Sequence, residues 1–583
     1  MKLKVAVFWL VILVALFVFL QTYSKYHFYF IEQTHLFQFT GEYISGKLII
    51  PGGFALVLSE FLVQFFILPY AGAAIIAGLL LITGLGVRGI VHRIIPDTTL
   101  FLLYLIPVVL IMFIHFDFNY LVAGTVALDI MLLALYFCLR ISNDKWRIVV
   151  EVLLSPVLYG AIGSAAFLFS ILVVIYELFN KTPKWYWVLL SGVLVVFCGI
   201  CSVYFAALGE YRFAFLPDAY YHTALEPKSV IYYSWISLPL ILILSFWLKH
   251  KQKRVSKKFL IAGCGVQVLL LFLLCWWGVP EYGDKKSIKV KELDYYARTE
   301  QWDKIIEESK GPLTNYLNLC YLNLALAHKG ELADRAFSFD QKGPLGLMVG
   351  WNKTEQISIL LSEVNFAMGN SALAQEMAFE AFATTIGEGN PRMLKRLVQT
   401  NLIYGEYPVA EKYIKVLENT GCYSSWASGQ RKFLYNDAEV EKDTALGSMR
   451  KSLPKDNYLS ELNNMEKDLR VIAETNPSNR NAIEYLGLFY LMSKDMAGFK
   501  GMVEHYYGTD VLPVLPKSFQ EAVITLSEAE PDYWKRFNIS PSVVQRFVEY
   551  KKQVLANRSN ANVLPGLMRR AYGDTYWFYF MFK

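Results

Sequence analysis

Residues 259–277 read FLIAGCGVQVLLLFLLCWW, and residues 281–293 shortly after them read EYGDKKSIKVKEL. The first stretch carries no charge and has the length of a helix that crosses a bilayer, which needs about 20 apolar residues. The second stretch is rich in Lys, Glu and Asp, as a helix in water is. The boundary near Pro280 therefore separates two parts of the chain that face different solvents, lipid and water.

The composition agrees with this division. Charged residues make up 18% of the 583 residues, against roughly 25% in a typical soluble domain, and the deficit lies between Val5 and Trp277. The net charge of +6 sits mostly in loops beside apolar segments, which indicates membrane orientation and not nucleic-acid binding. The seven cysteines form no disulfide pattern, and the Cys198/Cys201 pair lies within an apolar segment, where both are expected to be packing residues.

Seven apolar segments each have the length of one bilayer crossing. They are Val5–Gln21, Ala71–Val87, Thr98–Ile114, Tyr120–Leu139, Trp185–Phe205, Ile231–Leu248 and Phe259–Trp277. Two further segments are ambiguous. Phe54–Leu68 is short and carries Glu60 and Gln64 on one helix face, and Ile148–Phe179 is too long for one crossing and contains Pro156 and Gly163.

The positions of the basic loops discriminate between the possible membrane topologies, because Lys and Arg are enriched on the cytoplasmic side. One arrangement places every basic cluster inside, with Phe54–Leu68 as an interfacial helix and Ile148–Phe179 as a broken pair of helices. It has about nine crossings, a cytoplasmic N-terminus retained as an anchor, and a large tail outside. We therefore expect a multi-pass protein of the inner (cytoplasmic) membrane with a periplasmic C-terminal domain. The clusters are Arg88/Arg93, Arg140/Lys145/Arg147, Lys181/Lys184 and Lys249/Lys251/Lys253/Arg254/Lys257/Lys258.

The tail repeats a pattern of a helix, a glycine turn and a second helix with Ala at four-residue spacing. The turn glycines Gly330, Gly369 and Gly405 are 39 and 36 residues apart, close to the period of about 34 residues of tetratricopeptide repeats. The tail resembles such repeats, which implies an α-solenoid that binds a peptide or a partner domain. The whole fold is expected to be all-α, with residues 1–280 as the membrane domain, 281–510 as the repeat domain and 511–583 as an irregular capping region. The aromatic end, Tyr576–Phe582, is expected to dock on the solenoid, with contact to the membrane surface as the alternative.

No motif of a soluble enzyme is present: there is no GxxxxGK[ST], no HExxH and no paired CxxC. Under the predicted topology, the polar residues suited to chemistry lie in the outer loops. The first loop contains Glu32, His35 and Glu42, followed by the turn Pro51-Gly52-Gly53. The later outer loops contain His115, Asp117, Glu210, Arg212, Asp218 and His222.

The first outer loop resembles that of glycosyltransferases of the GT-C superfamily, which use polyprenyl-linked sugars. In that superfamily an acidic residue follows the first span, and Glu32 matches it; Pro51–Leu68 matches the proline turn and second interfacial helix. Here Gln33 follows Glu32, where the superfamily usually has an acidic pair. The resemblance implies Glu32, Glu42 and Asp117 as catalytic candidates. It implies Arg212 as the partner of the donor phosphate, and His35, Asp218 and His222 as substrate-binding residues. A carboxylate would accept the acceptor's proton or hold a divalent metal ion, and the sequence names no other cofactor.

Other interpretations stay open. Spans followed by tetratricopeptide-like repeats also resemble some membrane O-mannosyltransferases at the level of architecture. The chain as a whole resembles an uncharacterised family of bacterial multi-spanning membrane proteins with this two-part layout. A non-catalytic assembly protein that binds a partner through its repeats is the main alternative. A transporter is the second, and it would require an inverted repeat with broken helices.

Overall fold

The computed structural model describes residues 2–95, 101–223, 225–251, 257–283, 285–385, 387, 389–455, 458–528, 530, 532–559 and 562–583. Over these residues the chain is helical and contains no β-strand, only isolated bridges. It forms two compact units. The first comprises Met1–Ile288 with two short later segments, and the second comprises most of Lys289–Lys583. The all-α fold expected from the sequence is confirmed.

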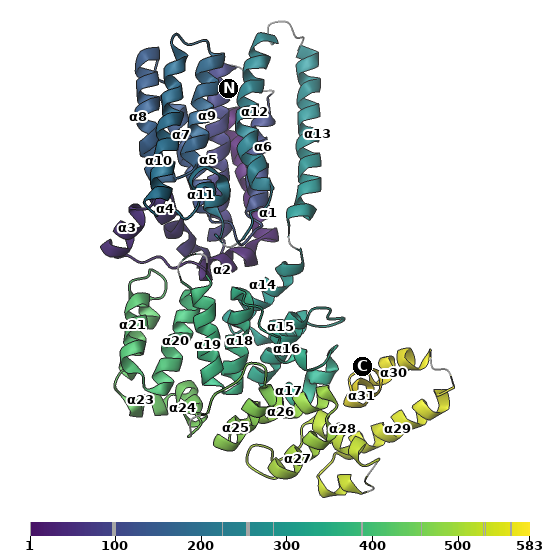
Figure 1. Cartoon of the computed structure of the whole chain (residues 1–583). Coiled ribbons are helices and arrows are strands. Elements are labelled where there is room, and N and C mark those ends of the chain that lie inside the picture. Colours follow the sequence, from purple (N-terminus) through teal and green to yellow (C-terminus); the bar gives the residue numbers. More distant parts are fainter. Residues whose placement is uncertain are drawn as a thin grey trace. The chain divides into compact units, whose positions relative to one another are not determined.

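In the first unit, long apolar helices run side by side (Figure 1). Five are long and apolar enough to cross a membrane: Leu3–Tyr23, Ala71–Ile94, Trp185–Tyr204, Val230–Lys249 and Ile261–Tyr282. The helices of this bundle are α1 (Lys2–Tyr23), α5 (Ala71–Ile94), η2 (Leu103–Leu105) with α6 (Ile106–Ile114), α7 (Ala123–Cys138), α8 (Asp144–Ile162), α9 (Ala165–Phe179), η3 (Trp185–Val188) with α10 (Leu189–Tyr204), α12 (Val230–Lys251) and α13 (Lys257–Tyr282).

Within the described residues, four of the nine expected crossings do not reach that length and apolarity. The apolar helices Leu103–Ile114, Ala123–Cys138 and Ala165–Phe179 are shorter, and α8 begins with charged residues. The number nine therefore stays a prediction. The expected break within Ile148–Phe179 is confirmed, because Gly163 ends α8 with a φ of 63° before α9 begins. Thr98 and Thr99 of an expected span, and Lys253 and Arg254 of a basic cluster, lie outside the described residues.

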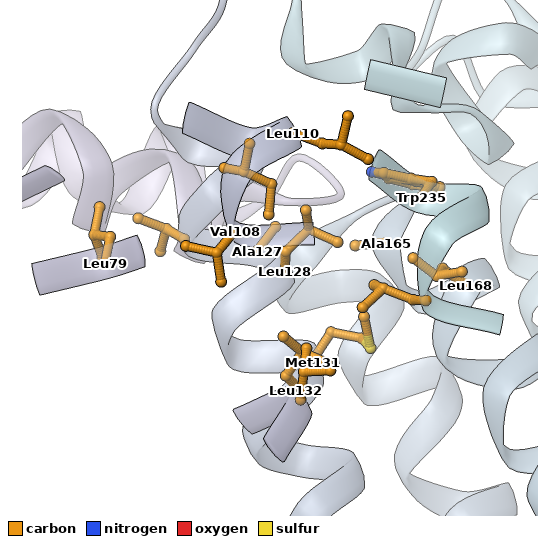
Figure 2. Close-up of a cluster of buried hydrophobic side chains, with 14 of the residues drawn as sticks. Leu79, Val108, Leu110, Ala127, Leu128, Met131, Leu132, Ala165, Leu168 and Trp235 are labelled. Carbon is orange, nitrogen blue, oxygen red and sulfur yellow. The ribbon is translucent and has the colours of Figure 1, made fainter. Parts of the chain in front are cut away.

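The core of this unit forms where α5, α6, α7, α9 and α12 meet (Figure 2). Leu132 on α7 is buried, and a Cβ added to Gly86 of α5 would lie 3.1 Å from its Cβ, so a small residue sets the spacing of these two helices. By contrast, α13 exposes Val266, Leu270 and Trp276. Such an apolar face is stable only when another apolar phase covers it.

Short helices connect the bundle at one end. They are α2 (Lys25–Gln33), α3 (Gly41–Leu48), α4 (Gly53–Val63) with η1 (Gln64–Ile67), α11 (Tyr211–Phe215) and η4 (Pro217–Tyr220). The stretch Phe54–Leu68, expected to be one helix, is thus an α-helix that tightens into a 3₁₀ turn. The polar stretch around Glu32, expected to be a loop, is helical: Glu32 lies in the last turn of α2 and is buried.

In the second unit, three helices end at a glycine in the left-handed conformation. Gly330, Gly369 and Gly405 have φ values of 68°, 95° and 78°, and each follows the first helix of an expected hairpin. The turn chemistry predicted from the sequence is therefore confirmed. The first hairpin is irregular, because its second helix, α17, has only four residues. The Ala336 carbonyl, at the end of α17, accepts from the Phe339 N–H (3.2 Å) and from Gln341 Nε2 (3.1 Å).

The helices of this unit are, in order, α14 (Lys285–Arg298), α15 (Trp302–Glu308), α16 (Tyr316–Lys329), α17 (Leu332–Arg335), η6 (Ala336–Ser338), η7 (Pro344–Gly346), α18 (Glu355–Met368), α19 (Ser371–Ala383), α20 (Pro391–Tyr404), α21 (Tyr407–Glu418), α22 (Ser424–Gln430), η8 (Arg431–Phe433), α23 (Asp437–Lys442), α24 (Thr444–Lys451), α25 (Met465–Thr475), α26 (Arg480–Ser493), α27 (Met496–Tyr506), α28 (Lys517–Leu526), η9 (Tyr533–Arg536), α29 (Pro541–Asn557), α30 (Leu564–Tyr572) and α31 (Tyr576–Phe582).

The aromatic C-terminal helix α31 packs within the second unit. Tyr576, Trp577, Phe578 and Tyr579 are buried. The Trp577 indole donates to the Glu521 carbonyl of α28 (2.8 Å), and the Tyr579 hydroxyl donates to the Met492 carbonyl of α26 (2.8 Å). The docking interpretation of this segment agrees with these contacts.

Candidate functional site

Two glycine turns come together beside the start of α4. The Gly52 N–H donates to the Gly160 carbonyl of α8 (2.9 Å), and a Cβ added to Gly52 would lie 3.4 Å from the Gly163 Cα. Gly52 and Gly163 both have positive φ, 86° and 63°, a conformation that glycine adopts without steric cost. The proline–glycine turn is therefore fixed against the break between α8 and α9.

A cavity of about 620 Å³ opens beside these turns. Its volume lies within the range of about 300–1,000 Å³ that is common for small-molecule sites. We call it the Glu210 cavity, because Glu210 is the one charged side chain among the described residues that line it. The lining residues are Ile50, Pro51, Gly52, Gly53, Leu56, Leu121, Ala123, Gly163, Ala207, Leu208, Gly209, Glu210, Phe213, Ala219, Tyr220 and Thr223.

Arg212 follows the lining residue Glu210 closely in the sequence and lies beside the cavity in space. Its Nε lies 2.8 Å from Glu210 Oε2, its Nη2 donates to the Thr223 carbonyl (3.3 Å), and both of these partners line the cavity. The Arg212 side chain is 35% exposed and that of Glu210 is 58% exposed. An exposed pair of this kind contributes little to stability, so the guanidinium can exchange its partner for an incoming anion at small cost.

The predicted residues Asp117, Asp218 and His222 lie in the neighbouring connections between helices. Asp117 accepts from the Asn119 N–H (3.1 Å) and lies 3.6 Å from Lys228 Nζ, and the His222 N–H donates to the Asn119 carbonyl (3.3 Å). Asp218 is buried and accepts from the Tyr232 hydroxyl (2.7 Å). Burial lowers the pKa of His222, which favours a neutral ring. The partners of Asp117 and Asp218 thus hold the connections around the Glu210 cavity in place.

Glu32 and His35 have different surroundings. The Glu32 carboxylate accepts from the Tyr423 hydroxyl (2.7 Å), and Tyr423 belongs to the same compact unit. His35 Nδ1 lies 3.0 Å from the Ile31 carbonyl, and its backbone forms a bridge with Gly387. Burial, opposed by the bond to Ile31, lowers the pKa of His35 to about 4. Both side chains are buried. The Glu32 side chain and the His35 backbone hold later segments of the chain beside α2.

The surroundings of Glu42 differ from those of the residues around the Glu210 cavity and from those of Glu32 and His35. It occupies the first turn of α3 and is exposed, where a carboxylate interacts favourably with the helix dipole. The Thr40 hydroxyl caps the same turn by accepting from the Tyr43 N–H (3.3 Å). Glu42 belongs neither to the lining of the Glu210 cavity nor to the contacts of Glu32 given above.

Sequence reasoning missed a buried ion pair. Lys47 Nζ lies 2.7 Å from Glu60 Oε1, and the Tyr43 hydroxyl donates to Glu60 Oε2 (2.5 Å). The sequence places Glu60 on one face of an expected interfacial helix, Phe54–Leu68, whereas the Glu60 side chain is only 1% exposed. The available signal was the position of Glu60 within an apolar stretch, because a carboxylate there requires a partner.

The described residues contain no group of three or more His, Cys, Asp or Glu side chains that could hold a metal ion. The seven cysteines form no disulfide bond among the described residues. The site therefore consists of one carboxylate, one guanidinium and an apolar wall.

Comparisons with known proteins give a family and no activity. Residues 1–583 match a family described as a family of unknown function (DUF6057). No curated protein and no solved structure matches the chain.

Proposed function

The chain belongs to the family of unknown function DUF6057, and we propose from its own residues that it is a membrane glycosyltransferase that uses a lipid-linked sugar. The observation that carries this proposal is the Glu210 cavity, which combines an apolar wall with a carboxylate and an adjacent guanidinium. An apolar wall suits a polyprenyl chain, and an arginine suits a phosphate.

The membrane arrangement is part of the proposal. Five helices have the length and apolarity of a crossing, and α6, α7, α8 and α9 complete nine crossings if the bilayer is thin around them. The basic clusters then lie in the cytoplasm, and α3 and α4 lie at the outer surface. In this arrangement the Glu210 cavity opens at the periplasmic face of an inner membrane.

The reaction needs a base and a stabiliser of the leaving group. The acceptor hydroxyl oxygen attacks C1 of the donor sugar, and the bond between C1 and the phosphate oxygen breaks. The hydroxyl proton passes to the Glu210 carboxylate, and the departing lipid phosphate pairs with Arg212. Glu210 thus takes the role that the sequence assigned to Glu32. Asp218 and His222 then position the loop that carries Glu210 and Arg212.

The test uses cells that carry the gene only as a plasmid copy. Glu210→Gln and Arg212→Gln each remove one charge with little change of size, and Glu226→Gln and Arg140→Gln are the matched controls outside the cavity. Mass profiles of surface glycans and of lipid-linked sugars are recorded at equal protein level. We expect a lost glycan and an accumulated lipid-linked donor in the two site variants only. Unchanged profiles in these variants and in the deletion strain exclude the transferase.

A second candidate function rests on the helix hairpins of the second unit. The pairs α18/α19 and α20/α21 each turn at a left-handed glycine, as tetratricopeptide repeats do. Repeats of this kind form a concave surface for a partner protein. If residues 281–510 form such a solenoid outside the membrane, the chain acts as an assembly protein. In that case deletion changes the abundance of a partner, and the site variants do not.

A further inference from the structure

A second, larger cavity lies between α8 and the start of α10. Its volume is about 870 Å³. Val149, Leu153 and Leu190 form its apolar wall, and Trp187 lies beside them. Lys145, at the start of α8, and Lys184, just before η3, also line it. We call this cavity the α8–α10 groove and define it by these six residues.

Beyond the groove, α8 and α10 approach each other closely. The Ser155 hydroxyl lies 3.3 Å from the Ser191 carbonyl, which marks a close approach of α8 and α10. Before that point, the chain enters α10 through the 3₁₀ turn Trp185–Val188, and Lys184 has a left-handed backbone with a φ of 61°. This entry lies beside the groove, because Lys184 and Trp187 line it together with Val149 and Leu153.

A buried ion pair fixes the head of the groove. Arg147 Nε and Nη2 lie 2.5 Å and 2.8 Å from the two carboxylate oxygens of Glu177, and Nη2 also donates to the Thr182 hydroxyl (3.2 Å). These bonds join the start of α8, the end of α9 and the loop that carries Lys184. A bidentate arginine holds its partners in one geometry, so the two lysines of the groove are presented by a rigid frame.

The charges at this head are unbalanced. Asp144, which also lines the groove, lies 2.8 Å from Arg147 Nη2, but Glu177 already pairs with Arg147. Three cations (Lys145, Arg147 and Lys184) against two carboxylates (Asp144 and Glu177) therefore leave one excess positive charge. Lys145 and Lys184 are exposed, and neither forms an ion pair with a carboxylate among the described residues. The groove therefore combines two available ammonium groups at its head with an apolar wall below them.

We propose that the α8–α10 groove binds one anionic phospholipid, with its phosphate at Lys145 and Lys184 and an acyl chain along Val149, Leu153 and Leu190. Charge complementarity selects the headgroup, and Trp187 has the amphipathic ring that is common at the level of lipid headgroups. The wall from Lys145 to Leu153 is about 12 Å long at 1.5 Å per helical residue, which accommodates part of an acyl chain. The groove lies at the start of α8, whereas the Gly163 turn of the Glu210 cavity lies at the end of α8. The two cavities are thus separate, so the inference does not depend on the proposed function.

The test measures lipid binding to the full chain in detergent by native mass spectrometry. The probes are phosphatidylglycerol, which is anionic, and phosphatidylcholine, which is zwitterionic, with the same acyl chains. The test variant is Lys145→Gln/Lys184→Gln. The matched control is Lys181→Gln/Lys249→Gln, which removes the same charge from residues outside the groove. A further variant, Leu153→Trp, fills the wall and keeps both lysines.

We expect wild type and the control to bind one phosphatidylglycerol about 30-fold more tightly than phosphatidylcholine, because each lysine beside an anionic lipid contributes a factor of about five. The double glutamine variant loses this preference, and Leu153→Trp weakens the binding of both lipids several-fold. Equal binding of both lipids to all variants overturns the proposal, since it shows contact with bulk lipid only. Displacement of the lipid by excess inorganic phosphate also overturns it, because the groove would then bind a free anion.

Discussion

The Lys47 ammonium lies 2.7 Å from the Glu60 carboxylate, and the two side chains are 5% and 1% exposed. The pair joins α3 to α4, the two helices that flank the Gly52 turn of the Glu210 cavity. A buried pair of this kind adds little net stability compared with an apolar pair, but removal of one partner leaves an uncompensated charge.

Glu60→Gln should therefore destabilise the protein strongly. We expect a loss of about 3–5 kcal/mol, because the buried Lys47 charge loses its partner. The apparent melting temperature of the full chain in detergent measures this loss. The control is Glu461→Gln, which disrupts the exposed pair with Lys467 and should cost less than about 1 kcal/mol. Equal melting temperatures for the two variants would contradict the buried pair.

Tyr423→Phe should release residues 419–424 from α2. The variant removes the hydroxyl that donates to Glu32, and a hydrogen bond to a charged group contributes about 1.5–3 kcal/mol. Amide hydrogen exchange in this segment should become at least about tenfold faster. Tyr435→Phe is the control, because the Tyr435 hydroxyl makes a long, exposed bond to Glu411 (3.4 Å).

Glu32→Gln separates a structural role of Glu32 from a catalytic one. If Glu32 only holds Tyr423, Glu32→Gln and Tyr423→Phe should have the same small effect on surface glycans. A complete loss of glycan in Glu32→Gln alone, with Tyr423→Phe unaffected, would instead restore Glu32 to the catalytic role that the sequence predicted. The measurement is the glycan mass profile at equal protein level.

The second unit should lose stability as the pH rises from about 4.5 to about 7. Burial raises the pKa of Glu521 from 4.5 to about 7. In this window the folded chain retains a proton that the unfolded chain has released, so folding becomes less favourable with rising pH. The maximum effect is about 3 kcal/mol, at about 1.4 kcal/mol per pKa unit.

Glu521→Gln should abolish that part of the pH dependence. Its amide oxygen can still accept from the Tyr576 N–H, which donates to Glu521 Oε2 (2.7 Å), and no proton is exchanged. The difference in melting temperature between pH 5 and pH 8 should therefore be smaller than in wild type. The exposed Glu528→Gln serves as the control, and an unchanged difference in Glu521→Gln would refute the assignment.

Gly369→Ala should cost more stability than Gly405→Ala. Both glycines have positive φ, and alanine in that region is strained by about 1–2 kcal/mol. A Cβ on Gly369 would also lie 2.3 Å from Asn479 Nδ2, whereas a Cβ on Gly405 meets nothing within 4 Å. Chemical denaturation of the two variants measures the difference, and equal losses would contradict the packing of Asn479 on this turn.

The sequence by itself determined the features that depend on local pattern. Apolar runs and their lengths identified the helices of the first part, and the spacing of Gly330, Gly369 and Gly405 identified the turns of the second. These features are readable because hydrophobicity and backbone conformation are properties of short segments. A break within Ile148–Phe179 was predicted for the same reason, and the structure places it at Gly163, while α8 continues through Pro156.

Only the tertiary structure decided which polar residues meet. Glu32 pairs with Tyr423, 391 positions away, and Glu60 pairs with Lys47. Glu210 gains its cavity from turns at Gly52 and Gly163. No local pattern records such contacts, because each depends on how separate helices pack against one another. The sequence supplied suitable residue types, and the packing of the helices decided which of them are buried partners and which face a cavity.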